Sequence, residues 1–405
     1  MFGMADIPPS AWLTIVGIGE DGIDGLALAS REALAQAQLV MGARRHLALL
    51  PGLDCVVVEW PVPFADGIAR LLAHRGERVV VLASGDPFWF GAATSLTRHL
   101  ARHEWRAHPA PSTFTFAAAR LGWPLEDTAC LGLHAAPLTR IRPHLAPGRR
   151  LIVLLRDGVA VAEMSAYLTS QGFGASQVHV LEALSGPRER FRTTIAAELT
   201  WTDMSHPVAL GIDCAGIAPV LGCASGRPDA LFDHDGQITK RPVRALTLSA
   251  LAPRPGELLW DIGAGSGSIG IEWLLSHPAN RAIAIEADPA RAARVRANAD
   301  ALGADRLQLV TGNAPAALPQ GAPPDAVFVG GGVSEPLLAH LFARLPAGTR
   351  LVVNAVTLES EALLVRAHAE KGGGLLRIEL AEAAPLGARR GWRAGYPVVQ
   401  WSAVL

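Results

Sequence analysis

Short apolar runs, each followed by a turn that contains glycine, recur along the first half of the chain. They have the length of buried strands, and strands are expected at residues 13–16, 79–83, 151–155 and 208–212. After the first run, residues 26–38 show the spacing of apolar positions that is typical of an amphipathic helix. This alternation predicts an α/β fold, in which ligands bind at the carboxyl ends of the strands.

A second α/β pattern begins near residue 238. Helices are expected at residues 243–251, 268–275 and 289–302, and strands at residues 258–261, 282–286, 307–311, 326–329 and 350–354. Strands that alternate with helices indicate a parallel sheet with helices on both faces. The residues between the two patterns contain glycine, proline and aspartate with little periodicity. We therefore expect one domain at residues 1–215, a linker at residues 216–236 and a second domain at residues 237–405.

Composition limits the classes of function. The chain has 405 residues, which is too many for one hydrophobic core, and 18% of them are charged with a formal net charge of −1. Because no block of lysine or arginine is present, a protein dedicated to nucleic acid is not expected. The apolar runs are too short to span a bilayer, and the four cysteines lack metal-binding spacing. We expect a cytoplasmic protein without a membrane segment.

A metal site is not expected either. His99 and His103 lie four residues apart on a possible helix, but arginines flank them and no glutamate lies between them. We interpret this pair as part of an exposed helix face.

A glycine loop in the second pattern follows a predicted strand and opens a predicted helix. It begins at Asp261 and includes Gly263, Gly265 and Gly267. Glycines permit positive φ in such a turn and leave room for a ligand that lies against the backbone. Asp261 at the strand end could accept hydrogen bonds from loop amides or from an ammonium group.

Two further polar residues follow the next strands. Glu286 could accept hydrogen bonds from both ribose hydroxyls of a nucleoside, and Asn313 lies where an adenine amino group could be read. The glycines at 265, 267 and 270 also satisfy the dinucleotide pattern, so an NAD-dependent oxidoreductase is the alternative for this half. An aspartate at the strand end before three alternating glycines favours S-adenosylmethionine as the ligand.

Three motifs give the C-terminal part a family resemblance. They are Asp-Gly-Gln-Ile-Thr-Lys at residues 235–240, Glu-Ala-Asp-Pro from Glu286, and the triple glycine at residues 330–332. This part resembles the decarboxylating precorrin methyltransferase domain of vitamin B12 biosynthesis. The resemblance implies a Rossmann-like class I methyltransferase fold and adds Thr239 to the cofactor contacts. Arg241 stands where the family often has an acidic residue, which could alter contacts to the substrate.

The N-terminal part carries a different set of turns. They are Gly-Ile-Gly at residues 17–19, Ser-Gly-Asp-Pro at residues 84–87 and Pro-Ser-Thr-Phe at residues 111–114. Their combination and order resemble the tetrapyrrole methylase family, and the match extends to residues 154–158 and 182–190. The resemblance implies two α/β lobes with S-adenosylmethionine between them, and it assigns to the cofactor Gly17, Gly19, Gly85, Asp86, Pro87, Ser112 and Thr113. The first loop departs from the family pattern, which leaves the roles of Glu20 and Asp21 open.

Together the two resemblances imply a bifunctional C-methyltransferase with one S-adenosylmethionine per domain and a precorrin macrocycle as substrate. The N-terminal domain would methylate ring carbon 5. The C-terminal domain would methylate ring carbon 15 and remove the carboxyl group of the acetate on ring carbon 12. No nucleophile motif is present, so the catalytic residues stay unassigned.

The remaining expectations concern the substrate and partners. Trp89 could form a wall for a flat ligand, and four arginines could clamp its carboxylates: Arg241, Arg244, Arg389 and Arg390. A homo-oligomer is expected. A tetrapyrrole carrier without catalytic activity is a further alternative.

Overall fold

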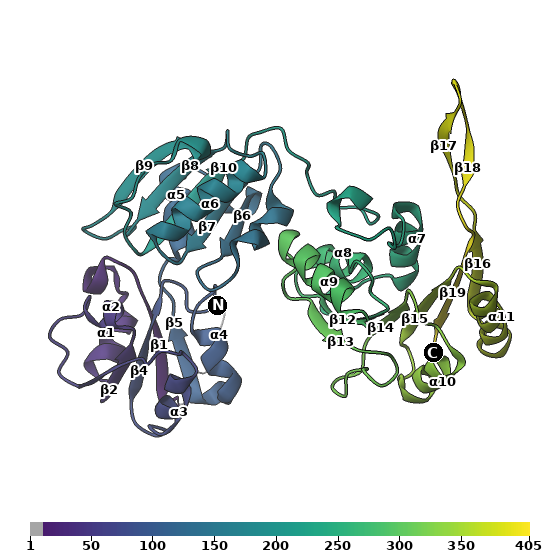
Figure 1. Ribbon diagram of the computed structural model, residues 1–405. Helices are drawn as coiled ribbons and strands as arrows, with labels where there is room; N and C mark the ends of the chain where they lie inside the picture. Colours follow the sequence, from purple (N-terminus) through teal and green to yellow (C-terminus); the bar gives the residue numbers. More distant parts are fainter. Residues whose placement is uncertain (1–10) are drawn as a thin grey trace, which may run out of the picture. The chain divides into compact units, whose positions relative to one another are not determined.

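The computed structural model describes residues 11–405, and these form two units (Figure 1). The first unit contains the chain up to residue 219 except residues 137–143, which belong with residues 220–405 to the second unit. No helix in the described part of the chain has the length and apolar character needed to cross a membrane.

The first unit begins with a parallel sheet of order β3-β2-β4-β1-β5. Its strands are β1 (Leu13–Ile18), β2 (Leu39–Gly42), β3 (Val56–Glu59), β4 (Val79–Ser84) and β5 (Trp105–His108). Alternate residues of β1 and β4 face two different apolar clusters, because successive side chains of a strand point to opposite faces. The helices of this lobe are α1 (Leu28–Ala35), α2 (Arg44–Leu47), α3 (Asp66–Leu72) and α4 (Ala93–Leu96).

A second sheet completes this unit, with the order β6-β7-β10-β8-β9. Its strands are β6 (Thr128–Gly132), β7 (Arg150–Leu155), β8 (Gln177–Glu182), β9 (Arg190–Ile195) and β10 (Val208–Asp213). Only β6 and β7 pair in parallel, whereas β10 is antiparallel to both of its neighbours. The helices α5 (Thr113–Leu121) and α6 (Gly158–Ser170) belong to this lobe. The predicted arrangement of two α/β lobes is confirmed.

The second unit contains a seven-stranded sheet of order β13-β12-β11-β14-β15-β19-β16. Its strands are β11 (Leu258–Ile262), β12 (Arg281–Glu286), β13 (Gln308–Thr311), β14 (Ala326–Val329), β15 (Arg350–Ala355), β16 (Gly374–Ile378) and β19 (Val398–Val404). The expected parallel sheet is correct for five strands, but β19 runs antiparallel to both β15 and β16. This is the strand arrangement of the predicted Rossmann-like fold.

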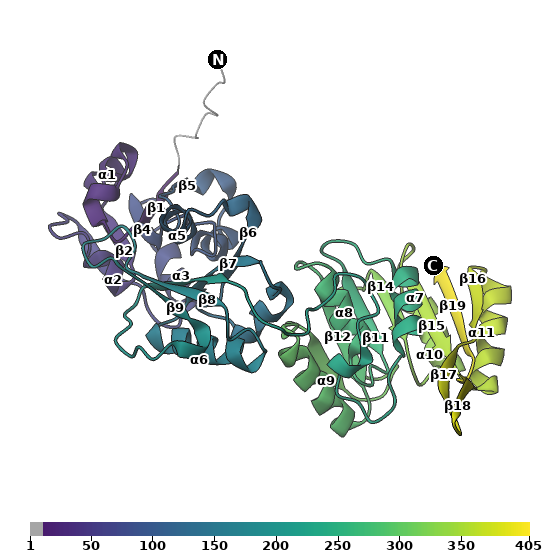
Figure 2. The ribbon, with the colours of Figure 1, turned by 90° about the horizontal axis from the view of Figure 1, so that it is seen from above.

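Helices cover both faces of this sheet, as predicted. One apolar cluster contains residues of α7 (Arg241–Leu251), α8 (Ser268–Ser276) and α9 (Pro289–Ala301), and α7 lies against β14 and β15 (Figure 2). The other cluster contains residues of α10 (Glu335–Arg344) and α11 (Leu358–Lys371). A hairpin of β17 (Ala381–Leu386) and β18 (Arg389–Ala394) projects from the sheet (Figure 1).

The residues expected to form a linker are largely part of the second unit. Leu221 and Phe232 belong to its apolar core, and Arg227 is buried and paired with Glu272. Residues 220–236 therefore pack as an extension of this unit, ahead of α7. The domain boundaries at residues 215 and 237 stay predictions.

Candidate functional site

The predicted cofactor loops of the N-terminal unit meet at Gly17. Gly85 donates its backbone N–H to the Ile18 carbonyl at 3.0 Å, and Ala110 donates its N–H to the Gly85 carbonyl at 3.1 Å. A Cβ on Gly17 would lie 1.9 Å from the Gly85 oxygen and 2.6 Å from the Ala110 nitrogen. The turns after β1, β4 and β5 therefore contact each other backbone to backbone, and only glycine fits at residue 17.

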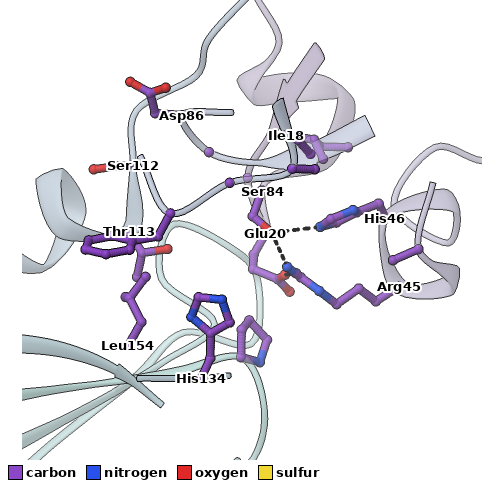
Figure 3. Close-up of a pocket in the computed structure, with 18 of the residues that line it drawn as sticks. Ile18, Glu20, Arg45, His46, Ser84, Asp86, Ser112, Thr113, His134 and Leu154 are labelled. Carbon is purple, nitrogen blue, oxygen red and sulfur yellow. Dashed lines mark hydrogen bonds and ion pairs between the residues drawn. The ribbon is translucent and has the colours of Figure 1, made fainter. Parts of the chain in front are cut away.

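A cavity of about 510 Å³ lies within this unit, lined by residues from both lobes (Figure 3). Five of the predicted cofactor residues line it: Gly19, Gly85, Asp86, Ser112 and Thr113. Trp89 also lines it, with its ring centroid 4.8 Å from that of Phe114. Gly17 and Pro87 are buried and do not line the cavity. The structure thus brings most of the predicted set to one cavity, and Trp89 forms part of its wall.

The polar side chains among the predicted cofactor residues can still form hydrogen bonds to a ligand. Ser112 caps α5, because its Oγ accepts the Thr115 N–H at 3.1 Å. Asp86 Oδ1 accepts the Phe88 N–H at 2.9 Å. A hydroxyl and a carboxylate each have further lone pairs, so these contacts do not exhaust either group. The cofactor roles of both residues stay predictions.

A polar cluster lies on one wall of the cavity (Figure 3). Arg45 of α2 donates through Nη1 to Glu20 Oε1 at 2.8 Å, and its Nη2 contacts Ser84 Oγ. His46 Nε2 lies 3.0 Å from the same hydroxyl. Burial, together with the neighbouring positive charge of Arg45, lowers the pKa of His46 to about 3. The imidazole is therefore neutral at pH 7, and Glu20, whose role the sequence left open, belongs to this cluster.

Four residues that line the cavity were not predicted from the sequence: Arg45, His46, His134 and His206. Burial lowers the pKa of both His134 and His206, so they are also neutral at pH 7. Arg45 and His46 follow β2, a strand of only four residues that the apolar pattern did not reveal. A polar run directly after a short apolar run was the available signal, because ligands bind at the carboxyl ends of strands.

The C-terminal loop is held by Glu286. Its Oε2 accepts the Gly265 N–H at 2.7 Å, and its Oε1 accepts the Asp288 N–H at 3.0 Å. These bonds place the carboxylate, which is only 6% exposed, directly beside the glycine loop. The Glu286 carboxylate can still accept hydrogen bonds from ribose hydroxyls, which is its predicted role, because each of its oxygens keeps a lone pair.

Glycine is needed at the three loop positions for different physical reasons. All have positive φ, with values of +70° at Gly263, +61° at Gly265 and +76° at Gly267. A Cβ on Gly263 would lie 2.7 Å from the Gly331 oxygen, and one on Gly267 would lie 2.8 Å from a Val295 methyl group. A Cβ on Gly265 would meet only the Gln237 oxygen, at 3.7 Å. Gly265 is therefore the position where the loop backbone is open to a ligand.

The other predicted contacts of this site lie on neighbouring segments. Thr239 is half-buried, two residues beyond Gln237, and the segment between them approaches Gly265. Asn313 is exposed and directly follows Gly312, whose N–H donates to the Glu286 carbonyl at 2.9 Å. Their contacts to a cofactor stay predictions.

The structure contradicts one expectation about the substrate. Arg244 is fully buried, and its Nε lies 2.7 Å from Glu272 Oε1, so it is wrong to expect it to clamp a substrate carboxylate. Arg241 is exposed, although its Nε donates to the Gly226 carbonyl at 2.8 Å. Arg389 and Arg390 are exposed on β18. For these three arginines, binding to substrate stays a prediction.

Asp261 lies beneath the glycine loop and is fully buried. Its Oδ2 accepts the N–H of Gly270 in the first turn of α8 at 2.9 Å, so it fixes the start of the helix that follows the loop. Its Oδ1 is buried and has no hydrogen-bond partner among residues 11–405. Burial raises the pKa of Asp261 from 3.8 to about 7, the Gly270 hydrogen bond opposes this shift, and the Glu286 charge adds to it.

This pKa predicts a pH-dependent stability. Because the folded state binds the Asp261 proton more tightly than the unfolded state, the resulting stabilisation is present below pH 4 and is lost as the pH rises to about 7. The difference corresponds to about 4 kcal/mol. Chemical denaturation at pH 4.5 and pH 8 should show this loss in the native chain and not in Asp261→Asn. Equal losses in both proteins would contradict the prediction.

Comparison with known proteins identifies the family of each part. Residues 12–200 match the model of tetrapyrrole (corrin/porphyrin) methylases, and residues 230–405 match the model of the precorrin methyltransferase domain. Precorrin-6Y C(5,15)-methyltransferase (decarboxylating) of Sinorhizobium sp is 49% identical over 398 residues, which cover 97% of this chain and 96% of that protein.

Two proteins of Salmonella typhimurium match smaller parts of the chain. Cobalt-precorrin-7 C(5)-methyltransferase is 27% identical over 178 residues, 44% of this chain and 88% of that protein. Cobalt-precorrin-6B C(15)-methyltransferase (decarboxylating) is 32% identical over 167 residues, 40% of this chain and 85% of that protein.

These findings confirm the family resemblances and the prediction of a methyltransferase, so the oxidoreductase and carrier alternatives fall away. Methyltransferases of this family use S-adenosylmethionine. With half of its residues identical to a relative that it matches over nearly its whole length, the chain belongs to the family of precorrin-6Y C(5,15)-methyltransferases (decarboxylating) of cobalamin biosynthesis.

Proposed function

We propose that this chain methylates a precorrin macrocycle at ring carbons 5 and 15 and removes the carboxyl group of the acetate on ring carbon 12 as carbon dioxide. The observation that carries the proposal is the near-complete match to a relative named for both methylations and the decarboxylation. The N-terminal domain would methylate carbon 5. The C-terminal domain would methylate carbon 15 and decarboxylate.

The proposal includes one S-adenosylmethionine per domain. Two separate glycine-loop sites support this count, one at the loops that meet at Gly17 and one at the loop beside Glu286. The buried Asp261 oxygen without a partner and the open space at Gly265 fit a cationic ligand that lies against the loop. The cytoplasmic location, self-association and lack of nucleic-acid binding expected from the sequence are also part of the proposal.

In each domain the cofactor supplies a methyl group that is already strongly electrophilic. The protein therefore has to hold the donor and an electron-rich ring carbon in line and exclude water. In the N-terminal domain, the apolar cavity wall that includes Trp89 and Phe114 would cover one face of the reactants. In the C-terminal domain, Glu286 fixes the loop through the Gly265 N–H and would orient the nucleoside. During decarboxylation, the electron pair that the departing carboxyl group leaves would pass into the macrocycle.

Gly265→Val should inactivate the C-terminal site. At φ +61° a side chain costs about 1–3 kcal/mol, and it would occupy the space in which the proposed cofactor lies. The full-length variant should release no carbon dioxide and transfer at most one methyl group, measured by mass spectrometry with deuterated methyl donor. Gly256→Val is a matched control, because Gly256 has φ +85° and open space around its Cβ position but lies before β11. Carbon dioxide release by Gly265→Val at the native rate would refute the assignment.

A complementation experiment tests the two sites without assuming which methylation comes first. Gly17→Ala, which alters the N-terminal loops, is mixed with Gly265→Val, and each protein alone should fail to add both methyl groups. The mixture should produce the doubly methylated, decarboxylated macrocycle if the two sites are independent. Double methylation by either variant alone would contradict the division of labour.

A further inference from the structure

The N-terminal cavity contains a single positively charged side chain. Among the described residues that line it, Arg45 is the only arginine, and no lysine is present. The other walls are mainly apolar and aromatic. The arginines expected from the sequence to clamp substrate carboxylates all lie in the C-terminal domain, so Arg45 is a separate candidate for the N-terminal site.

Two contacts hold the guanidinium of Arg45 in place and leave part of its hydrogen-bonding capacity for a ligand. Nη1 donates to Glu20 Oε1 at 2.8 Å, and Nη2 contacts Ser84 Oγ. A guanidinium has five N–H donors in a rigid planar arrangement, so these two contacts leave others for a ligand. The side chain of Arg45 is 35% exposed, whereas that of Glu20 is 10% exposed. The open part of the pair is therefore its positive end.

The carboxylate beside Arg45 is divided between two cations. Arg188 Nη2 also donates to Glu20 Oε2 at 3.1 Å. Glu20 therefore only partly offsets the charge of Arg45. Burial lowers the pKa of His46 and of His206, so neither imidazole adds charge at pH 7. Asp86 is the second carboxylate that lines the cavity, and its hydrogen bond comes from the Phe88 N–H and not from Arg45.

The position of Arg45 relates it to the proposed cofactor. Ser84, which Arg45 contacts, directly precedes Gly85 and Asp86, two residues that are expected to bind S-adenosylmethionine. A carboxylate held by Arg45 would thus be fixed relative to the strand end that positions the methyl donor. Orientation of this kind decides which carbon of a large, nearly symmetric ring lies in line with the methyl group.

We propose that Arg45 is the carboxylate anchor of the N-terminal site, binding one peripheral carboxylate of the macrocycle and so selecting the carbon that is methylated. Glu20 is its positioning residue, acting through the bond to Nη1. This inference rests on the proposed function, because the polycarboxylate substrate follows from it. No bond is made or broken by either side chain.

The test compares two neighbouring arginines of α2 in the full-length protein. Arg45→Gln should raise the KM for the macrocycle by about 10- to 100-fold, the effect of losing a charged hydrogen bond, while binding of S-adenosylhomocysteine stays native. Arg44→Gln is the matched control, since Arg44 is exposed and does not line the cavity. It should leave KM unchanged. An unchanged KM in Arg45→Gln would overturn the anchor.

A second measurement separates an anchor from a merely structural role. Macrocycles with one carboxylate converted to an amide are offered to the native protein and to Arg45→Gln, with methylation at carbon 5 followed by mass spectrometry. One particular monoamide should lose 10- to 100-fold in kcat/KM with the native protein and lose nothing further with Arg45→Gln. Equal penalties in both proteins for every monoamide would overturn the proposal. If the native protein methylates no carbon 5 at all, the proposed function has failed instead.

Discussion

Gly17→Ala should reduce methyl transfer by the N-terminal domain at least a hundredfold. The added Cβ would lie 1.9 Å from the Gly85 oxygen and 2.6 Å from the Ala110 nitrogen, and both are backbone atoms that no rotamer change can move away. Relief requires the turns after β1, β4 and β5 to separate. Overpacking of this kind costs about 1–3 kcal/mol, and a displacement of about 1 Å in a site can cost a hundredfold in rate.

The measurement is methylation at carbon 5 under single turnover, together with the affinity for S-adenosylhomocysteine. Gly76→Ala is the control, because Gly76 has φ +92° and no atom within 4 Å of its Cβ position. It should lose about 1 kcal/mol of stability through backbone strain and keep its methylation rate. A Gly17→Ala protein with native rate and native affinity would show that these turns do not form the cofactor site.

The sequence predicts that these turns lie at one edge of a sheet. It does not predict which strands pair with one another. Each turn follows an apolar run, and the carboxyl ends of parallel strands lie at one edge of a sheet, so the motifs at residues 17–19 and 84–87 were placed correctly. The strands β2 and β3 have only four residues each and lack a distinct pattern. An apolar run also says nothing about strand direction, so the antiparallel pairing of β10 with β7 and β8 could not be predicted, and β19 was not among the expected strands.

In the C-terminal domain, the positions of the strand-end residues could be predicted better than the packing of the segment before α7. Asp261 and Glu286 lie at the ends of β11 and β12, and their side chains accept the backbone N–H groups of Gly270 and Gly265, respectively. The packing of the segment before α7 could not be predicted, because its two buried apolar residues, Leu221 and Phe232, stand isolated among glycine and proline. Such isolated apolar positions become informative only when the partner surface is known.

The structural role of Arg244 is indicated by the apolar spacing of its helix. The buried residues of α7 include Arg244, Thr247, Leu248 and Leu251, which recur with helical spacing. An arginine on that apolar face has to find a buried acid, since an unpaired buried charge is very costly. Glu272 lies on α8, whose residues 268–274 are all buried, and so it was the available partner. Chemistry alone could not distinguish a ligand clamp from this structural role.

Arg244→Met should therefore lower the free energy of unfolding of the second unit by about 3–5 kcal/mol. The change removes the partner 2.7 Å from Glu272 Oε1 and leaves that fully buried carboxylate with the backbone N–H groups of Gly226 and Arg227 and the side chain of Arg227. Urea unfolding of the full chain, followed through the transition of this unit, measures the loss. Arg377→Met is the control, because the Arg377–Glu379 pair is more than half exposed and should contribute less than about 1 kcal/mol.

The double variant Arg244→Met, Glu272→Gln tests whether the Arg227–Glu272 ion pair that remains in Arg244→Met still stabilises this unit. It should be less stable than Arg244→Met alone, because it also removes the carboxylate partner of the buried Arg227. Arg244 also donates to the Thr239 carbonyl, in the segment that approaches Gly265, so the same variants should weaken binding of S-adenosylhomocysteine at the C-terminal site. A loss below 1 kcal/mol in Arg244→Met would mean that the segment before α7 is held by its apolar contacts instead.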